Sequence, residues 1–147
     1  LTYVDKEGAL KRPVMLHRAI VGSPERFLMI LIEHFAGDFP TWLSPVQVKI
    51  LPITDKQLDY ASQIVNQLKE QGIRVELDDR SERLQAKIRD AQLEKVPYML
   101  IIGQKEVESD QVAVRTRNEV DLGAMAIGKF VNSIQQEITS KSLELMK

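Results

Sequence analysis

From Val46 onward, segments typical of strands alternate with segments typical of helices, and this alternation constrains the fold more than any other feature. Apolar, β-branched runs predict strands at Val46–Leu51, Ile73–Leu77 and Tyr98–Ile102. Between these runs, apolar residues recur every three or four positions, which predicts helices. A strand–helix–strand order of this kind folds as an open α/β sheet with helices on both faces.

The C-terminal part of the pattern adds antiparallel strands. Gln111–Arg117 alternates apolar and polar residues, and it follows Tyr98–Ile102 after only Gly103–Asp110. Because that connection is too short for a helical crossover, the two strands are expected to be antiparallel neighbours. A short strand or turn near Glu119–Leu122 and a long amphipathic helix around Ile127–Ile138 complete the pattern. The expected fold is a three-layer α/β domain with a mixed, mostly parallel five-stranded sheet.

Polar turns are expected to gather where the parallel strands end. In open α/β sheets, ligands bind at the carboxyl ends of those strands. Here that end of the sheet holds Ile53, the turn around Ser81 and the segment Gln104–Glu108. In the helix that follows Ser81, we expect the apolar residues to face the sheet and Lys87 to point outward.

A separate block precedes the alternating region. Pro13–Val21 is rich in apolar and β-branched residues, which predicts a buried strand. Ser23 is a good N-cap and Pro24 suits the first helical position, so a helix is expected from Pro24 to about Phe35. Its residues Phe27–Ile32 are apolar in succession, which predicts burial on more than one face in an intact protein. Together these elements predict a strand followed by a helix.

Helix breakers are dense in Ala36–Pro45, which also contains the single tryptophan, and this density indicates a connection. Trp42 is interpreted either as a wedge between two domains or as a partly buried anchor of the linker. We therefore divide the chain into residues 1–38, a linker at 39–45 and a domain at 46–147. Because the sequence opens at Leu1 with a polar stretch, we expect the tail of a larger polypeptide.

Composition excludes several classes of protein. The chain has 147 residues, of which 44% are hydrophobic and 28% charged, and these values are typical of a folded globular chain. Because it has no cysteine, it contains no disulfide and no CxxC motif. No apolar run reaches the roughly 18 residues of a membrane span and no secretory signal is found, so we expect a cytoplasmic protein. The 20 basic and 21 acidic side chains give a net charge of −1, so any contact with nucleic acid must be local.

Three residues of the first block are candidates for chemistry. His17 is either a histidine packed in the core or on a sheet face, or a metal ligand. Ser23 and Arg26 stand at the start of a helix, where anions bind readily, although capping explains Ser23 and a surface position explains Arg26. The turn after the first strand of the alternating region lacks GxGxxG and P-loop glycines, which argues against a dinucleotide or P-loop site.

Arg115 and Arg117 share one face of a predicted strand with Ala113. Two planar guanidinium groups on one sheet surface suit bidentate recognition of a guanine edge or a phosphate. Glu106 and Glu108 precede them, and their carboxylates can accept hydrogen bonds from a base or hold the arginines in place. The alternative is a solvated cluster of salt bridges.

Several strings along the chain resemble a single family. His17–Phe27 (HRAIVGSPERF) resembles the third signature motif of class II aminoacyl-tRNA synthetases, in the form found in bacterial threonyl-tRNA synthetases. Phe39–Val48 (FPTWLSPVQV) resembles the junction of that family. Lys105–Glu108 (KEVE) and Val112–Arg117 (VAVRTR) resemble its anticodon-binding domain. The resemblance implies the end of a catalytic domain, present as a strand–helix remnant of its antiparallel sheet, followed by a complete anticodon-binding domain.

For the catalytic remnant, the resemblance implies incomplete chemistry. The family ligates threonine to tRNA(Thr) with ATP and magnesium through a threonyl-adenylate. Arg26 corresponds to a residue that grips ATP phosphate, Ser23 to a serine near the reacting groups, and His17 to one of three zinc ligands. The other two ligands, a cysteine and a histidine, lie upstream in the family. This part alone is therefore expected to hold no zinc and to be inactive.

For the anticodon-binding domain, the resemblance implies that a threonine anticodon, which ends in G and U, is read as unstacked bases. Arg115 and Glu106 correspond to residues that read bases, and Ile53 corresponds to a residue that packs against a base. Lys95 stands where many relatives have arginine, and Ser81 stands where many have asparagine.

The expected partners are tRNA(Thr), threonine and ATP. The resemblance implies a homodimer for the full-length enzyme, formed mainly by the catalytic domain, and a monomer for this part. Two alternatives remain open. One is a non-catalytic, synthetase-like accessory module, and the other is a flavodoxin-like domain that binds a small molecule.

Overall fold

The computed structural model describes residues 1–146, and the chain forms two compact units, Leu1–His34 and a larger one that starts at Phe35. The strands are β1 (Tyr3–Val4), β2 (Leu10–Lys11), β3 (Val48–Pro52), β4 (Val75–Leu77), β5 (Tyr98–Ile102), β6 (Gln111–Thr116) and β7 (Asp121–Ala126). The helices are α1 (Pro24–Phe35), α2 (Leu58–Glu70), α3 (Leu84–Leu93), α4 (Gln104–Ser109) and α5 (Ile127–Ser140), with a 3-10 turn at Asp55–Gln57 before α2. Within residues 1–146, no helix is long and apolar enough to cross a membrane.

The first unit confirms the predicted helix but not the predicted strand. α1 begins at Pro24 and ends at Phe35, as expected, and none of its residues is buried within the described chain. The prediction of a buried strand at Pro13–Val21 is wrong, because this run is exposed and has no regular secondary structure. A strand needs a neighbour for its N–H and C=O groups, and residues 1–146 pair no other strand with this run.

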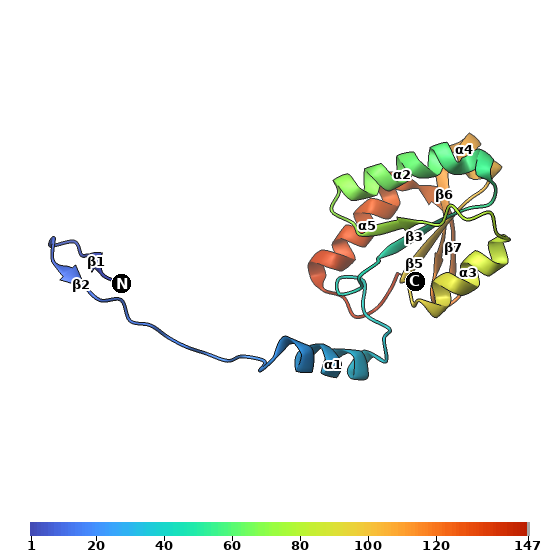
Figure 1. The fold of residues 1–147 in the computed structure, drawn as a ribbon. Coiled ribbons are helices and arrows are strands. Elements are labelled where there is room, and N and C mark those ends of the chain that lie inside the picture. The colour runs from blue at the N-terminus through green and yellow to red at the C-terminus, as the bar shows by residue number, and fades with distance from the viewer. Residues whose placement is uncertain (147) are drawn as a thin grey trace. The chain divides into compact units, whose positions relative to one another are not determined.

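The second unit is built on a five-stranded sheet with the order β4-β3-β5-β6-β7 (Figure 1). β3 pairs in parallel with β4 and β5, whereas β6 pairs antiparallel with β5 and β7. The mixed α/β sheet is therefore confirmed, although its described pairings are parallel and antiparallel in equal number rather than mostly parallel. The connection between β5 and β6 is too short for a helical crossover, as the sequence predicts, but it contains the short helix α4.

Helices cover both faces of this sheet (Figure 1). On one face, α2 and α5 pack over a core that includes Leu100, Val114 and Phe130. On the other face, Ile88 of α3 packs against Met99 of β5. Because side chains alternate along each strand, residues next to each other in β6 face different layers.

Lys87 of α3 contradicts the prediction that it points outward. Only 3% of its surface is exposed, and its ammonium donates to the carbonyl of Pro52 at 3.2 Å and of Asp78 at 3.0 Å. Helical periodicity places polar residues outside, but carbonyls at a strand end need donors, and a long amine reaches them.

Residues 36–46 include the predicted linker at 39–45, and from here on this whole stretch is called the linker. It is fastened to the rest of the second unit by side chains of that unit. Cations from three places donate to linker carbonyls: Arg74 to Trp42 and Ser44, Arg117 to Asp38 and Phe39, and Lys95 to Ala36. The partly buried ring of Trp42 lies 5.8 Å from the ammonium of Lys141. These contacts support the interpretation of Trp42 as an anchor of the linker.

Candidate nucleic-acid interface

Ile53 and Glu106 meet at the carboxyl ends of β3 and β5. Glu106 lies in the first turn of α4, and its Oε2 accepts the backbone N–H of Gly103 at 2.9 Å. A side chain on Gly103 would bring its Cβ to 2.8 Å from both Glu106 Oε2 and Ile53 Cδ1. The two side chains therefore enclose Gly103, and only glycine fits between them without a shift.

Together these two side chains present an apolar surface beside an oriented acceptor. Gly103 occupies one carboxylate oxygen of Glu106, so the other oxygen is left to accept an N–H from a ligand. Ile53 is 43% exposed, while its backbone N–H is held by the carbonyl of Ile102 at 2.9 Å. An apolar side chain next to a hydrogen-bonded carboxylate suits a flat, unstacked base with one face to bury and one N–H edge to satisfy.

Ser81 faces Ile53 across an open hollow of about 320 Å³. The hollow lies between the turn after β3 and the turn after β4, and its lining is Ile53, Thr54, Asp55, Arg80, Ser81, Glu82, Arg83 and Lys87. Gln57 orders the first turn, because its Oε1 accepts the backbone N–H of Thr54 at 3.0 Å and the Thr54 hydroxyl at 2.7 Å. Of the predicted site residues, Ile53 is thus the one shared by the hollow and the Glu106 contact.

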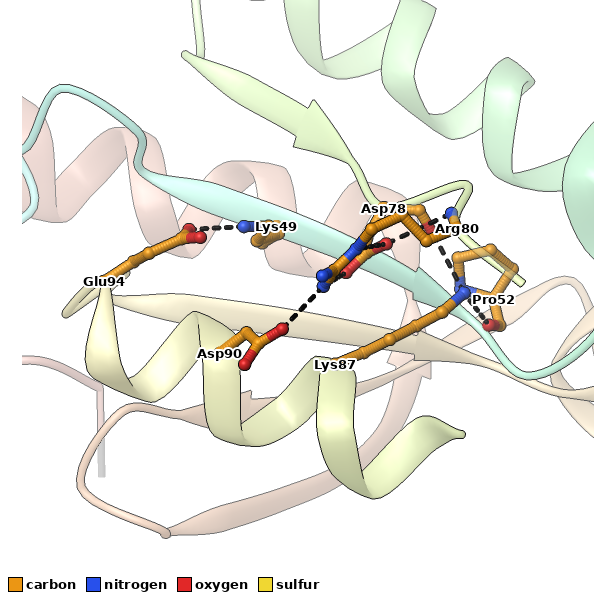
Figure 2. Close-up of polar contacts among 7 residues, drawn as sticks. All are labelled: Lys49, Pro52, Asp78, Arg80, Lys87, Asp90 and Glu94. Carbon is orange, nitrogen blue, oxygen red and sulfur yellow. Dashed lines mark hydrogen bonds and ion pairs between the residues drawn. The ribbon is translucent and has the colours of Figure 1, made fainter. Parts of the chain in front are cut away.

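A group of ion pairs supports the turn that carries Ser81 (Figure 2). Arg80 grips the buried carboxylate of Asp78 through bonds of 2.9 and 2.6 Å, and it reaches Asp90 of α3 at 2.9 Å. The hydrogen bonds from Arg80 hold the pKa of Asp78 below its ordinary value, although burial opposes the shift. The Asp78 contact, followed by the Asp90 contact, raises the pKa of Arg80. Because both partners stay charged at neutral pH, the turn is fixed to α3.

Arg115 stands away from the carboxyl ends. It pairs with Met99 of β5, three residues before Ile102, which corresponds to a distance of about 10 Å along the strand. Like its partner Met99, Arg115 belongs to the face of the sheet that α3 covers in part. It is partly exposed, and its buried Nε has no hydrogen-bond partner among residues 1–146. The buried Nε cannot meet a ligand, so the donors left for a ligand are those of the two Nη atoms, which make no hydrogen bond within residues 1–146.

Arg117 does not form a second open guanidinium beside Arg115, and the prediction of such a pair is wrong. Its Nη1 donates to the carbonyl of Phe39 at 2.7 Å, and its Nη2 donates to the carbonyl of Asp38 at 3.0 Å. Burial lowers the pKa of Arg117, and the nearby Asp38 carboxylate opposes this shift. The strand pattern does not reveal that carbonyls of the linker accept the hydrogen bonds of the Arg117 guanidinium. Nor do the described residues join Arg115 to Glu106 or Glu108 by an ion pair.

Lys95 also turns toward the linker. It follows α3 with a positive φ of 59°, and its ammonium donates to the carbonyl of Ala36 and lies 3.6 Å from Asp38 Oδ2. In this structure the Lys95 ammonium binds the linker, and a contact between Lys95 and a base remains a prediction.

The candidates of the first block, His17, Ser23 and Arg26, are all exposed. Ser23 caps α1, because its Oγ accepts the backbone N–H of Arg26 at 3.3 Å. His17 Nε2 lies 3.1 Å from Met15 Sδ, and residues 1–146 contain no group of three histidines, cysteines or carboxylates able to hold a metal ion. A zinc site that includes His17 therefore requires ligands from elsewhere.

Comparison with known proteins gives a family and a set of relatives. The sequence model of a family described as "Anticodon binding domain" matches residues 47–137. The chain is 59% identical to a threonine–tRNA ligase of Clostridium tetani over 147 residues, which is all of this chain and 23% of that protein. It is 56% identical to a threonine–tRNA ligase of Clostridioides difficile over 95% of this chain and 22% of that protein. The chain thus spans less than a quarter of the length of these relatives.

Solved structures give a consistent picture. The RNA-binding domain of threonyl-tRNA synthetase from Cryptosporidium parvum superimposes with a TM-score of 0.77 and 34% identity, over 92% of this chain and 35% of that chain. Prolyl-tRNA synthetase from the same organism, complexed with L-proline and AMP, superimposes with a TM-score of 0.62 and 26% identity, over 69% of this chain and 22% of that chain.

Proposed function

We propose, because the chain belongs to the anticodon-binding domain family, that it recognises the anticodon loop of tRNA(Thr) as one part of a threonine–tRNA ligase. The observation that carries the proposal is the enclosure of Gly103 by Ile53 and Glu106 at the carboxyl ends of β3 and β5. This arrangement suits a base that has been taken out of its stack, which is how proteins read single-stranded loops.

Because Arg115 lies apart from Ile53 and Glu106 along the strands, we propose that these residues contact different bases. Arg115 reads the guanine, because a guanidinium matches the O6 and N7 acceptors of guanine through two parallel hydrogen bonds. Glu106 accepts an N–H of the neighbouring uracil, and Ile53 packs against the face of that base. Ser81 lines the far side of the hollow and contacts the loop there. Lys95 contributes positive charge near the loop.

The complete enzyme, in this proposal, ligates threonine to tRNA(Thr) with ATP through a threonyl-adenylate. Arg26 and Ser23 would take part in the ATP and threonine site, and His17 would be one of the zinc ligands. Because most of that site lies outside this chain, the chain alone binds RNA and does not activate threonine. We further propose that the complete enzyme is a cytoplasmic homodimer and that this part is a monomer.

The decisive test measures binding to two RNA hairpins. One carries the anticodon GGU, and the other has the same composition with the G and U of the last two positions exchanged. We expect tighter binding of the GGU hairpin at every salt concentration, while both affinities fall as salt rises because phosphate contacts are lost. Equal affinities throughout the salt series would refute the proposal.

A substitution of Arg115 locates the discrimination. Arg115→Lys keeps the charge but loses the planar guanidinium, so about 1 to 3 kcal/mol of discrimination between the hairpins should disappear. The same exchange at the exposed Arg89 of α3 is the matched control and should leave the discrimination unchanged. If both variants discriminate like the unmodified chain, Arg115 does not read a base.

A further inference from the structure

Among the residues that line the hollow, Lys87 is buried and the others are exposed. The Lys87 side chain rises from α3 and ends between the last residue of β3 and the first residue after β4 (Figure 2). There it donates to the Pro52 carbonyl at 3.2 Å and to the Asp78 carbonyl at 3.0 Å, and the residue is 3% exposed.

This burial is costly, because a cation removed from water loses several kcal/mol unless it is well paired. The nearby carboxylate of Asp78 is already gripped by Arg80 through both of its oxygens. Lys87 therefore depends mainly on two neutral carbonyls. A side chain that only had to fill this space could be apolar at lower cost.

Lys49 provides a comparison on the same side of the sheet. It is also a buried lysine, with 7% of its surface exposed, but its ammonium pairs with the carboxylate of Glu94 (Figure 2). Glu94 is itself half-exposed, and neither residue lines the hollow. Lys49 thus forms a conventional ion pair, whereas Lys87 ties two backbone turns together.

Those two turns carry the residues assigned to the anticodon. Pro52 directly precedes Ile53, and Asp78 lies three residues before Ser81. The hollow is bounded by both turns, and Lys87 is part of its lining. A donor that holds both carbonyls therefore fixes the width of the hollow.

We propose that Lys87 is a positioning residue for anticodon recognition, because it joins the turns of Ile53 and Ser81 and so sets the shape of the hollow that receives the base. This inference rests on the proposed function and names a determinant of its specificity. Lys87 acts through Ile53 and Ser81, not through a contact with the reacting groups of the enzyme.

The test compares Lys87→Met with Lys49→Met in the 147-residue chain. Both exchanges replace a buried lysine on the same side of the sheet by an apolar residue of similar length. For Lys87→Met we expect the ratio of affinities for the two hairpins to fall about tenfold, which corresponds to about 1.4 kcal/mol. For Lys49→Met the ratio should stay that of the unmodified chain, whatever the loss of stability in urea.

Each result has a distinct meaning. If the unmodified chain does not prefer the GGU hairpin, the proposed function fails. If the unmodified chain discriminates and Lys87→Met discriminates equally well, the inference about Lys87 is wrong while the proposed function stands. An equal loss of affinity for both hairpins would also overturn it, because that result indicates lost charge rather than lost shape.

A measurement on the unmodified chain covers the case in which Lys87→Met does not fold. The ¹⁵N resonance of the Lys87 ammonium is followed while each hairpin is added. A larger shift with the GGU hairpin than with the exchanged hairpin supports the inference. The same response to both hairpins, or no response, refutes it.

Discussion

Gly103 is required by the approach of two side chains and not by its backbone conformation. Its φ of −109° is accessible to any residue, but a Cβ would lie 2.8 Å from both Ile53 and Glu106. Glu106 Oε2 is bound to the Gly103 N–H, so it cannot move aside without losing this hydrogen bond, whereas Ile53 Cδ1 ends an exposed side chain that has to turn away. The glycine thus allows the carboxylate and the apolar side chain to lie side by side.

Replacing Gly103 by alanine should therefore damage binding. The added methyl group has to displace Ile53 or Glu106, so we expect weaker binding of the GGU hairpin and a stability loss of about 1 to 3 kcal/mol. Gly128→Ala is the matched control, because nothing lies within 4 Å of its added Cβ. Urea unfolding and hairpin titration measure both effects. Unchanged binding by Gly103→Ala would show that the close contact is not needed.

The pKa of Asp78 predicts how acid affects stability. Because the folded-state pKa lies below the ordinary value of 3.8, Asp78 stabilises the fold above that value and ceases to do so as the pH falls through the lowered pKa. Asp78→Asn should cost about 1 to 3 kcal/mol at pH 7 and less at pH 3, which lies below the ordinary pKa of 3.8. Urea unfolding at the two pH values gives the comparison. An equal cost at both values would mean that the ion pair with Arg80 does not stabilise the fold.

At the level of single residues, the sequence predicts which residues lie at the site better than it predicts what each side chain contacts. Glu106, Ile53 and Ser81 were identifiable as a group because each follows a predicted strand, and that position is a property of the pattern. Lys87 was misplaced because periodicity does not record the two carbonyls that draw its ammonium inward. Gly103 was overlooked, although a glycine three residues before a glutamate at a helix start is a capping signal.

Strand β6 and the residue that follows it serve two purposes with two arginines. Arg115 has donors left for a ligand, whereas Arg117 holds the linker carbonyls of Asp38 and Phe39. The two residues are two positions apart, so the same strand supports the candidate base contact and the attachment of the linker.

Removing the guanidinium of Arg117 should loosen the linker without altering base discrimination. Arg117→Gln leaves the carbonyls of Asp38 and Phe39 without their donor, at a cost of about 1 to 3 kcal/mol in the free energy of unfolding. Arg89→Gln on the exposed side of α3 should be neutral. Urea unfolding and hairpin titration separate the two properties. A loss of discrimination in Arg117→Gln would contradict the division of roles.

At the level of helices and strands, the sequence pattern predicts a strand correctly where a neighbouring strand is present to pair with it. Tyr98–Ile102 lies between two neighbouring strands, so its apolar run and its environment give the same answer. Pro13–Val21 has a comparable run but no paired strand among residues 1–146, and it stays extended and exposed. Residues 104–109 form a helix that the length of the connection between β5 and β6 does not predict. A connection too short for a helical crossover can still hold one or two helical turns.

For the whole molecule, the linker belongs physically to the second unit despite its composition. Glycine and proline are typical of flexible connections, yet Arg74, Lys95 and Arg117 donate to carbonyls along this stretch. Residues 12–22 have no such contacts among the described residues and no regular secondary structure, apart from the proximity of His17 to Met15. The part of the chain that a protease should cut first therefore lies before α1.

Limited digestion with proteinase K should display this difference. The first cuts are expected within residues 12–22, and the linker should resist cleavage until the second unit unfolds, because bound backbone does not fit a protease. Arg117→Gln should make the linker more susceptible, and mass spectrometry of the fragments locates the cuts. A first cut between residues 36 and 46 in the unmodified chain would contradict the expected order.

The fastening of Asp38 and Phe39 by Arg117 has a mechanical consequence. When the sheet rotates, these two residues move with it, so the distance between β6 and this part of the linker stays constant. If Arg115 binds a base as proposed, a force on β6 would reach Asp38 directly through the Arg117 guanidinium.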